Sequence, residues 1–253
     1  MNRALTLLLL GSLTTACDDD LDKVHINISD GNINVTNRDE PPAPEPAGAP
    51  VDVTGFDALG TETFVDVVAN VGPKHAARLQ CDPEIAKTLE VLVDDTVLVV
   101  RKASTTSTQS ASGPCTLHAT APNWRAVVSI GSGDVQISGP LPALEQVHSA
   151  GSGDVSITGV DDAPSLLVAA TGAGDIALQG SAGTLTASTS GSGDVLAGNL
   201  AAQTATATTT GSGDVAVHTN ETLTALTRGS GDILTSGPGS VTATSEGSGQ
   251  VRQ

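Results

Sequence analysis

The sequence predicts an all-β protein whose main part is a parallel β-helix, a β-solenoid with coils of about 20 residues that are expected to be right-handed. Three observations lead to this prediction. A Gly-Ser-Gly-Asp-Val motif recurs seven times between residue 131 and the C-terminal residues, with small variations. Apolar and polar residues alternate on both sides of each copy, as in β-strands. The 253 residues also include two Phe, one Trp and no Tyr, which suits a narrow core.

The first residues predict export and lipid anchoring. Residues 1–16 have the features of a lipoprotein signal peptide: a positive Arg3, an apolar run at Leu5–Leu10, and small residues before Cys17. We expect Cys17 to carry the lipid, including palmitate, and to hold the protein in the bacterial cell envelope, facing the periplasm or the cell surface. An ordinary secretory signal with an incidental cysteine is the alternative.

Residues 17–50 predict an acidic, Pro-rich tether. Asp18–Asp22 is an acidic run, and residues 39–50 (DEPPAPEPAGAP) are of a composition that forms extended spacers. Between them, Val24–Ile28 and Ile33–Val35 alternate around Asp30-Gly31, which predicts a short hairpin. The tether would hold the folded part away from a membrane.

The solenoid is expected over residues 51–253, with its regular repeats at 126–253. Phe64–Val71 predicts a strand, Pro83–Leu89 one helical turn, Val91–Val100 a hairpin with an acidic turn, and 103–113 a loop. Because an exported protein meets an oxidising compartment and two cysteines remain after Cys17, we predict a disulfide between Cys81 and Cys115.

Each repeat predicts two short strands on either side of a glycine corner. Four residues before the first glycine of each motif lies Val or Ala, and four residues after it lies Val or Ile, so these columns form an inward core. A sharp corner needs either a positive φ or a close approach of backbones, and glycine permits both. The corner glycines are Gly131, Gly133, Gly151, Gly153, Gly172, Gly174, Gly191, Gly193, Gly211, Gly213, Gly229 and Gly231.

Stacked coils would also place six carboxylates in one column, with neighbours about 5 Å apart and a mutual repulsion of about 0.8 kcal/mol in bulk water. Three interpretations stay open: solvated side chains that accept hydrogen bonds from backbone N–H groups at the corner, a calcium site, and a recognition ridge. In the second interpretation calcium would be the cofactor of the protein. The column consists of Asp134, Asp154, Asp175, Asp194, Asp214 and Asp232.

The repeats, the Val53–Leu59 lead-in, the hairpin before residue 102 and the Ala121–Trp124 step together resemble the head GIN domain family over about residues 51–253. That resemblance implies a parallel β-helix on an exported, often lipid-anchored bacterial protein with an adhesin label. The family brings no established catalytic or ligand residues to carry over.

Composition excludes several functions. The formal charge of −17 and the scarcity of aromatic residues argue against nucleic-acid binding. Few bases accompany the acids of the repeats, so catalysis is not expected. The favoured interpretation is a non-catalytic binding or structural module on the envelope. Three kinds of partner are expected. The lipid would bind the membrane, the solenoid would bind an envelope or extracellular protein or glycan, and the solenoid ends would bind other copies of the chain. The alternatives are a calcium-binding cell-surface solenoid and a carbohydrate-active β-helix enzyme.

Overall fold

The computed structural model describes residues 24–29, 32–37, 48–104 and 113–253, and divides the chain into two compact units, Met1–Glu45 and Pro46–Gln253. In the first unit, β1 (Val24–Ser29) pairs with β2 (Asn32–Asn37) in an antiparallel hairpin that sets Ile28 opposite Ile33. The hairpin agrees with the alternation around Asp30-Gly31. The predicted signal peptide and Cys17 lie outside the described residues.

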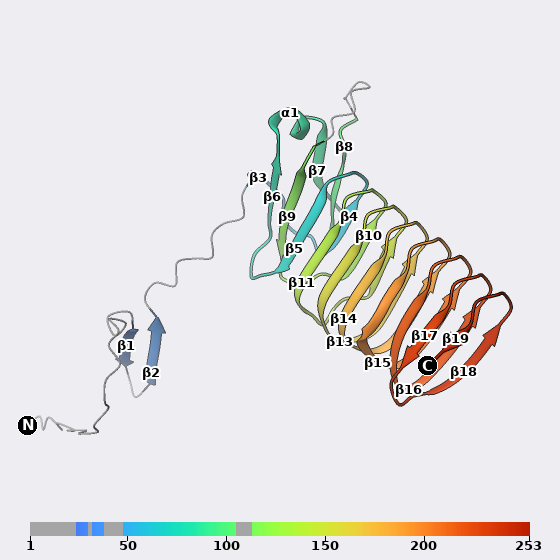
Figure 1. The fold of residues 1–253 in the computed structure, drawn as a ribbon. Helices are drawn as coiled ribbons and strands as arrows, with labels where there is room; N and C mark the ends of the chain where they lie inside the picture. The colour runs from blue at the N-terminus through green and yellow to red at the C-terminus, as the bar shows by residue number, and fades with distance from the viewer. Residues whose placement is uncertain (1–23, 30–31, 38–47, 105–112) are drawn as a thin grey trace, which may run out of the picture. The chain divides into compact units, whose positions relative to one another are not determined.

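The second unit is a β-solenoid in which successive coils lie side by side along one axis (Figure 1). Its regular part runs from β10 to β19, and every pairing within it is parallel. The strands of this part are β10 (Ala126–Ser129), β11 (Val135–Leu141), β12 (Gln146–Ser149), β13 (Val155–Ala170), β14 (Ile176–Thr189), β15 (Val195–Thr209), β16 (Val215–Thr227), β17 (Ile233–Ser236), β18 (Ser240–Ser245) and β19 (Val251–Arg252).

The prediction of two short strands per repeat holds for the first and last coils. In the middle coils, from β13 to β16, the strand after one motif continues without a break into the strand before the next. Bends in these long strands coincide with shifts of register, for example between Thr158 and Ala163. Each middle coil therefore has one sharp corner, at the Gly-Ser-Gly motif, and one softer bend.

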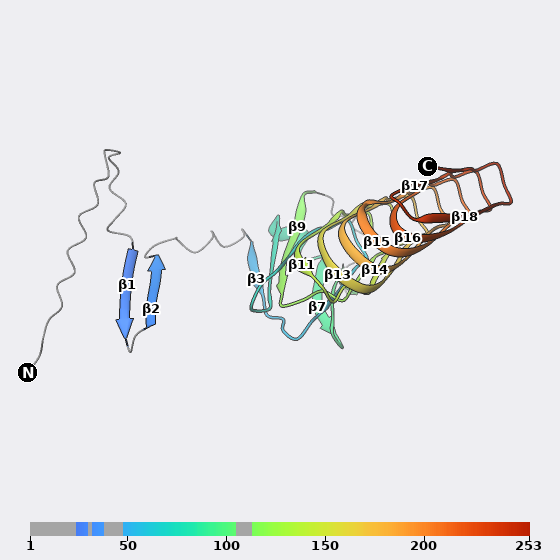
Figure 2. The same ribbon diagram turned by 90° about the horizontal axis from the view of Figure 1, so that it is seen from below.

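The N-terminal end of the solenoid, where Figure 2 labels β3, β7 and β9, mixes parallel and antiparallel pairing. A single helical turn, α1 (Pro83–Ala86), lies where one was predicted, and β7 pairs with β8 as the predicted hairpin. The unit begins at Pro46, slightly before the expected boundary, because the first strand pairs with β6. The strands are β3 (Ala49–Val51), β4 (Ala58–Thr61), β5 (Asp66–Val71), β6 (Ala76–Cys81), β7 (Leu89–Asp94), β8 (Val97–Lys102) and β9 (Cys115–Ala121).

The predicted disulfide is present in this end region. Cys81 and Cys115 are opposite each other in the antiparallel pair of β6 and β9, with 4.5 Å between their Cα atoms. Cys115 is buried, so the bond joins the outer strand β6 to the core. It ties together two segments that are 34 residues apart in sequence.

Close approach of backbones, and not a positive φ, explains the motif glycines. The glycines with positive φ all lie outside the motif. A Cβ on Gly193 would instead lie 2.2 Å from the carbonyl oxygen of Gly174, and one on Gly211 would lie 2.0 Å from that of Gly191. No side chain fits there, because each corner rests directly on the backbone of the preceding coil.

The core is narrow, as the composition indicates. Val127, Val147 and Val168 stack on one wall and give way to Ala187 and Ala207 in later coils, all fully buried. The wider N-terminal end holds the aromatic rings. Phe56 packs on His75 and on Trp124, with ring centroids 4.8 and 5.6 Å apart, and the Trp124 indole N–H donates to the Asn70 carbonyl oxygen.

Candidate functional site

The aspartates of the motif form one continuous hydrogen-bonded column, the Asp ladder. In each coil the Oδ1 atom of the motif aspartate accepts a hydrogen bond from the backbone N–H of the equivalent residue in the next coil. The distance is 2.9 Å from Asp154 N to Asp134 Oδ1 and 2.8 Å from Asp214 N to Asp194 Oδ1. The same contact joins all six predicted members, Asp134, Asp154, Asp175, Asp194, Asp214 and Asp232.

The ladder extends one residue beyond the prediction at each end. At its start, Asp66 accepts from the Asp134 N–H at 3.0 Å, although Asp66 follows Thr63-Phe64-Val65 and not a glycine motif. At its end, the Gln250 N–H donates to Asp232 Oδ1 at 2.8 Å, and Arg252 forms an ion pair with Asp232 Oδ2 at 3.1 Å. Asp66 was missed because its only signal was the Asp-Val pair after an apolar residue.

These contacts support the first of the three interpretations, with one correction. The donor is the backbone of the neighbouring coil, whereas an Asx-turn would use an N–H of the same corner. A hydrogen bond to a charged acceptor stabilises by about 1.5–3 kcal/mol, which outweighs the repulsion between neighbouring carboxylates in water. Among the described residues, no three His, Cys, Asp or Glu side chains gather in a way that could hold a metal ion.

The ladder predicts a specific difference between two substitutions of Asp194. Asp194→Ala removes the acceptor of the Asp214 N–H, so we expect a loss of about 1–2 kcal/mol in the free energy of unfolding. Asp194→Asn keeps an Oδ1 acceptor and removes a charge, so its stability should stay within about 0.5 kcal/mol of the wild type. Urea titration of the three proteins measures both values.

Calcium serves as the check on this interpretation. If the ladder is structural, millimolar calcium should leave the Tm of wild type and Asp194→Asn equally unchanged. A calcium-dependent rise in Tm that only the wild type shows would contradict the structural interpretation and favour a cation site.

A second feature is an uncharged face built from hydroxyl side chains. On the sheet before the motif, strands β14, β15 and β16 alternate buried and outward positions, and β18, whose residues are all exposed, continues the same columns. Eleven of the twelve outward positions of these four strands carry Thr or Ser. Leu226 takes the twelfth. We call this surface the hydroxyl face. It consists of Thr184, Thr186, Ser188, Thr204, Thr206, Thr208, Thr222, Thr224, Ser240, Thr242 and Thr244.

The hydroxyl face is in unbroken register from coil to coil. Thr186 pairs with Thr206, Thr206 with Thr224, and Thr224 with Thr242, so four threonines form one straight column. The hydroxyls of Thr204 and Thr184 in the next column are 3.4 Å apart. Sequence reasoning concentrated on inward positions and missed this surface, although Thr-x-Thr occurs in each of the four coils.

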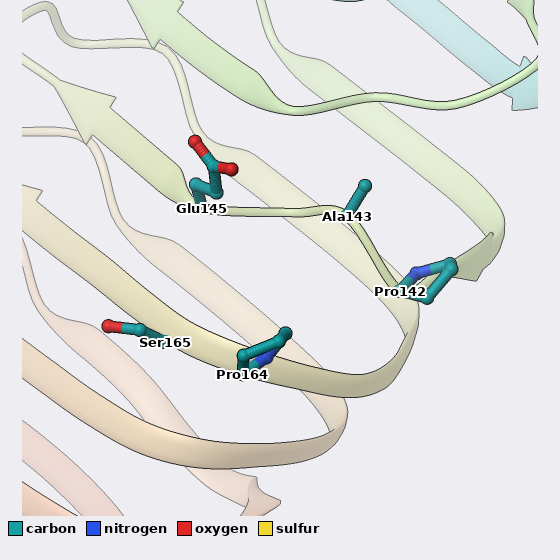
Figure 3. Close-up of a pocket in the computed structure, with 5 residues that line it drawn as sticks. All are labelled: Pro142, Ala143, Glu145, Pro164 and Ser165. Carbon is teal, nitrogen blue, oxygen red and sulfur yellow. The ribbon is translucent and has the colours of Figure 1, made fainter.

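Two shallow hollows lie elsewhere on the unit. One, of about 430 Å³, is lined by Pro142, Ala143, Glu145, Pro164 and Ser165 (Figure 3). The other, of about 320 Å³, lies beside the disulfide and has one acid, Asp82. The Asp82 carboxylate already accepts the Glu84 N–H at the start of α1. Each hollow therefore brings one carboxylate to its lining and lacks the pair that glycoside hydrolysis uses.

Comparison with known proteins assigns this architecture to a family. Residues 55–239 match the family model described as "Putative auto-transporter adhesin, head GIN domain". The chain belongs to the head GIN domain family. This confirms the resemblance carried by the glycine motifs and by the lead-in strand. No curated protein matches the chain.

Solved structures share the head GIN fold. A putative adhesin from Bacteroides fragilis has a TM-score of 0.73 at 24% identity, over 80% of this chain and 94% of that chain. A putative lipid binding protein from Parabacteroides distasonis has a TM-score of 0.62 at 19% identity, over 81% of this chain and 96% of that chain. At these identities the likeness concerns the fold of the head GIN domain. The family description suggests a protein of the cell surface or envelope.

Proposed function

We propose that this head GIN protein is a lipid-anchored, non-catalytic binding module of the bacterial envelope that acts in adhesion. The observation that carries the proposal is the hydroxyl face, a rigid surface on which the same outward side chains recur coil after coil. Many identical weak contacts, presented together, give a combined affinity that none has alone. The adhesin description of the family is consistent with this role.

The N-terminal sequence supplies the anchor in this proposal. Cys17 follows small residues and an apolar run, and the acidic Pro-rich segment after it is of a spacer composition. A lipid on Cys17 together with a tether would present the solenoid at a distance from the membrane. Within the described residues no helix is long and apolar enough to cross a bilayer.

The charged side chains of the regular coils support a non-catalytic role. Arg228 forms an ion pair with Glu246 at 2.7 Å, and Arg252 pairs with Asp232. The aspartates of the Asp ladder use Oδ1 to hold neighbouring coils. These groups have structural partners, which is a different arrangement from an acid and a base facing each other across a cleft.

Substitution of Cys17 tests the proposal in cells. We expect the wild type, expressed in a bacterial host, to incorporate labelled palmitate, to sediment with membranes and to raise retention of the cells on a surface under flow. Cys17→Ser should incorporate no label, leave the membrane fraction and raise retention no more than an empty vector. Equal labelling or equal retention of the two strains would contradict the proposal.

A further inference from the structure

The hydroxyl face has a composition that strand propensity does not explain. Threonine is common in strands, so an outward threonine by itself signifies little. The opposite sheet of the same four coils provides an internal comparison, since its strands belong to the same chain and the same repeats. Its outward positions hold Ala177, Gln179, Leu196, Gly198, Ala216, His218, Leu234 and Ser236, of which one carries a hydroxyl. Hydroxyl side chains are therefore concentrated on one face.

The spacing of the hydroxyl face repeats in two directions. Neighbouring coils in a parallel sheet are about 4.8 Å apart, and outward residues along one strand are about 6.6 Å apart. The pairing of Thr184, Thr186 and Ser188 with Thr204, Thr206 and Thr208 contains no shift of register. Figure 1 shows successive coils displaced along one axis, so both spacings persist over the face. A surface periodic in two directions suits a partner that is itself periodic in two directions.

The chemistry of the face favours ordered water as that partner. Each threonine presents a methyl group and a hydroxyl on a side chain with a stiff χ1, so little entropy is lost on binding. The hydroxyls can hydrogen-bond to water, and the methyl groups leave room for water molecules to bond to one another. No charged residue occupies the twelve positions of the face, although the chain has a net charge of −17.

We propose that the hydroxyl face binds the surface of an ice crystal. The spacing between coils is close to the shortest repeat of the oxygen lattice of ice, so water ordered along the threonine columns can join that lattice. This deepens the proposed function and rests on it, because ice would be the surface to which the same hydroxyl face adheres. Carbohydrate is a weaker match, because sugar sites commonly use aromatic side chains and none lies on this face.

Thermal hysteresis measured on the purified full-length protein carrying Cys17→Ser tests the proposal directly. We expect faceted ice crystals and a freezing point held below the melting point. Thr206→Lys, at the centre of the face, should reduce the hysteresis to the level of an unrelated protein. Thr206→Val, which keeps the shape and removes the hydroxyl, should reduce it partly. Ser156→Lys, at an exposed outward position of the opposite sheet, is the matched control and should leave it unchanged.

Circular dichroism melts establish that each variant is folded. A variant that loses hysteresis but keeps its Tm has therefore lost it through the change in the hydroxyl face and not through unfolding. Absence of hysteresis in the parent protein, or full hysteresis in Thr206→Lys, would overturn the proposal. The proposal would also be overturned if the parent protein showed no hysteresis but self-associated, and if Thr206→Lys abolished that self-association. The partner of the hydroxyl face would then be a second copy of the chain. Because these assays need no anchor and no cell, their outcome is independent of the palmitate and retention results.

Discussion

Gly193→Ala is expected to destabilise the solenoid by about 3 kcal/mol or more, since an added Cβ would overlap backbone that cannot move aside. That Cβ would lie 2.2 Å from the carbonyl oxygen of Gly174 and 2.8 Å from its carbonyl carbon. Relief requires the two coils to separate, which would lengthen the hydrogen bonds of the corner and the contact between Asp194 and Asp175. At about 2–4 °C per kcal/mol for a chain of this size, Tm should fall by about 6–12 °C.

Gly198→Ala is the matched control, five residues after Gly193 and within β15. A Cβ at Gly198 would meet only the Cβ of Ala216, at 3.9 Å, and the position is exposed. Replacing this glycine restricts the unfolded chain, so we expect stability to be unchanged or raised by about 0.4–1 kcal/mol. Equal losses in Gly193→Ala and Gly198→Ala, measured by urea and thermal denaturation, would refute close backbone approach as the reason for the motif glycines.

Removal of the disulfide is the second change with a large expected effect. The double variant Cys81→Ser/Cys115→Ser frees a loop with a sequence separation of 34 residues. The chain-entropy model gives a loss of about 3–4 kcal/mol for a loop of this length. The loss should appear first in β6 and β9, because the bond joins these strands at the N-terminal end of the solenoid.

Reductant provides the comparison for this experiment. The wild type in reductant should unfold at the urea concentration of the double variant, and the double variant should not respond to reductant. Hydrogen exchange should show faster exchange at β6 while the amides of β14 and β15 keep their protection. A wild type whose stability is the same with and without reductant would show that the bond adds nothing to folding.

The regular coils could be predicted because the same motif and the same alternation of apolar and polar residues recur in every coil. The spacing of the Gly-Ser-Gly motif defined the coil, and the alternation around it assigned Val135, Val155 and Ile176 to the core, where all three are buried. Stacking of the coils then predicted that the aspartates lie in one column. What the pattern left open was the donor to each carboxylate, since that depends on which N–H of the neighbouring coil faces it.

The N-terminal end was harder to predict because its strands occur once. Alternation in residues 76–81 is weak, and the antiparallel pairing of β6 with both β3 and β9 depends on contacts far apart in sequence. Asp66 joins the Asp ladder without a glycine motif, because the residues on which Gly131 and Gly133 rest are Thr63 and Val65. The hydroxyl face was missed for a different reason: attention to the core ignores outward residues.

The softer bend determines where residues can be inserted into a coil. From Ser149 to Val155, from Thr189 to Val195 and from Thr227 to Ile233 the glycine corner spans the same number of residues, and its pairing is in step throughout. The register shifts of β13, β14 and β15 fall away from this corner, from Thr158 to Ala163, from Ala177 to Gln179 and from Ala197 to Thr204. Insertions and grafted peptides therefore belong at the softer bend, where the chain can bulge outward while the corner, the Asp ladder and both sheets keep their stacking.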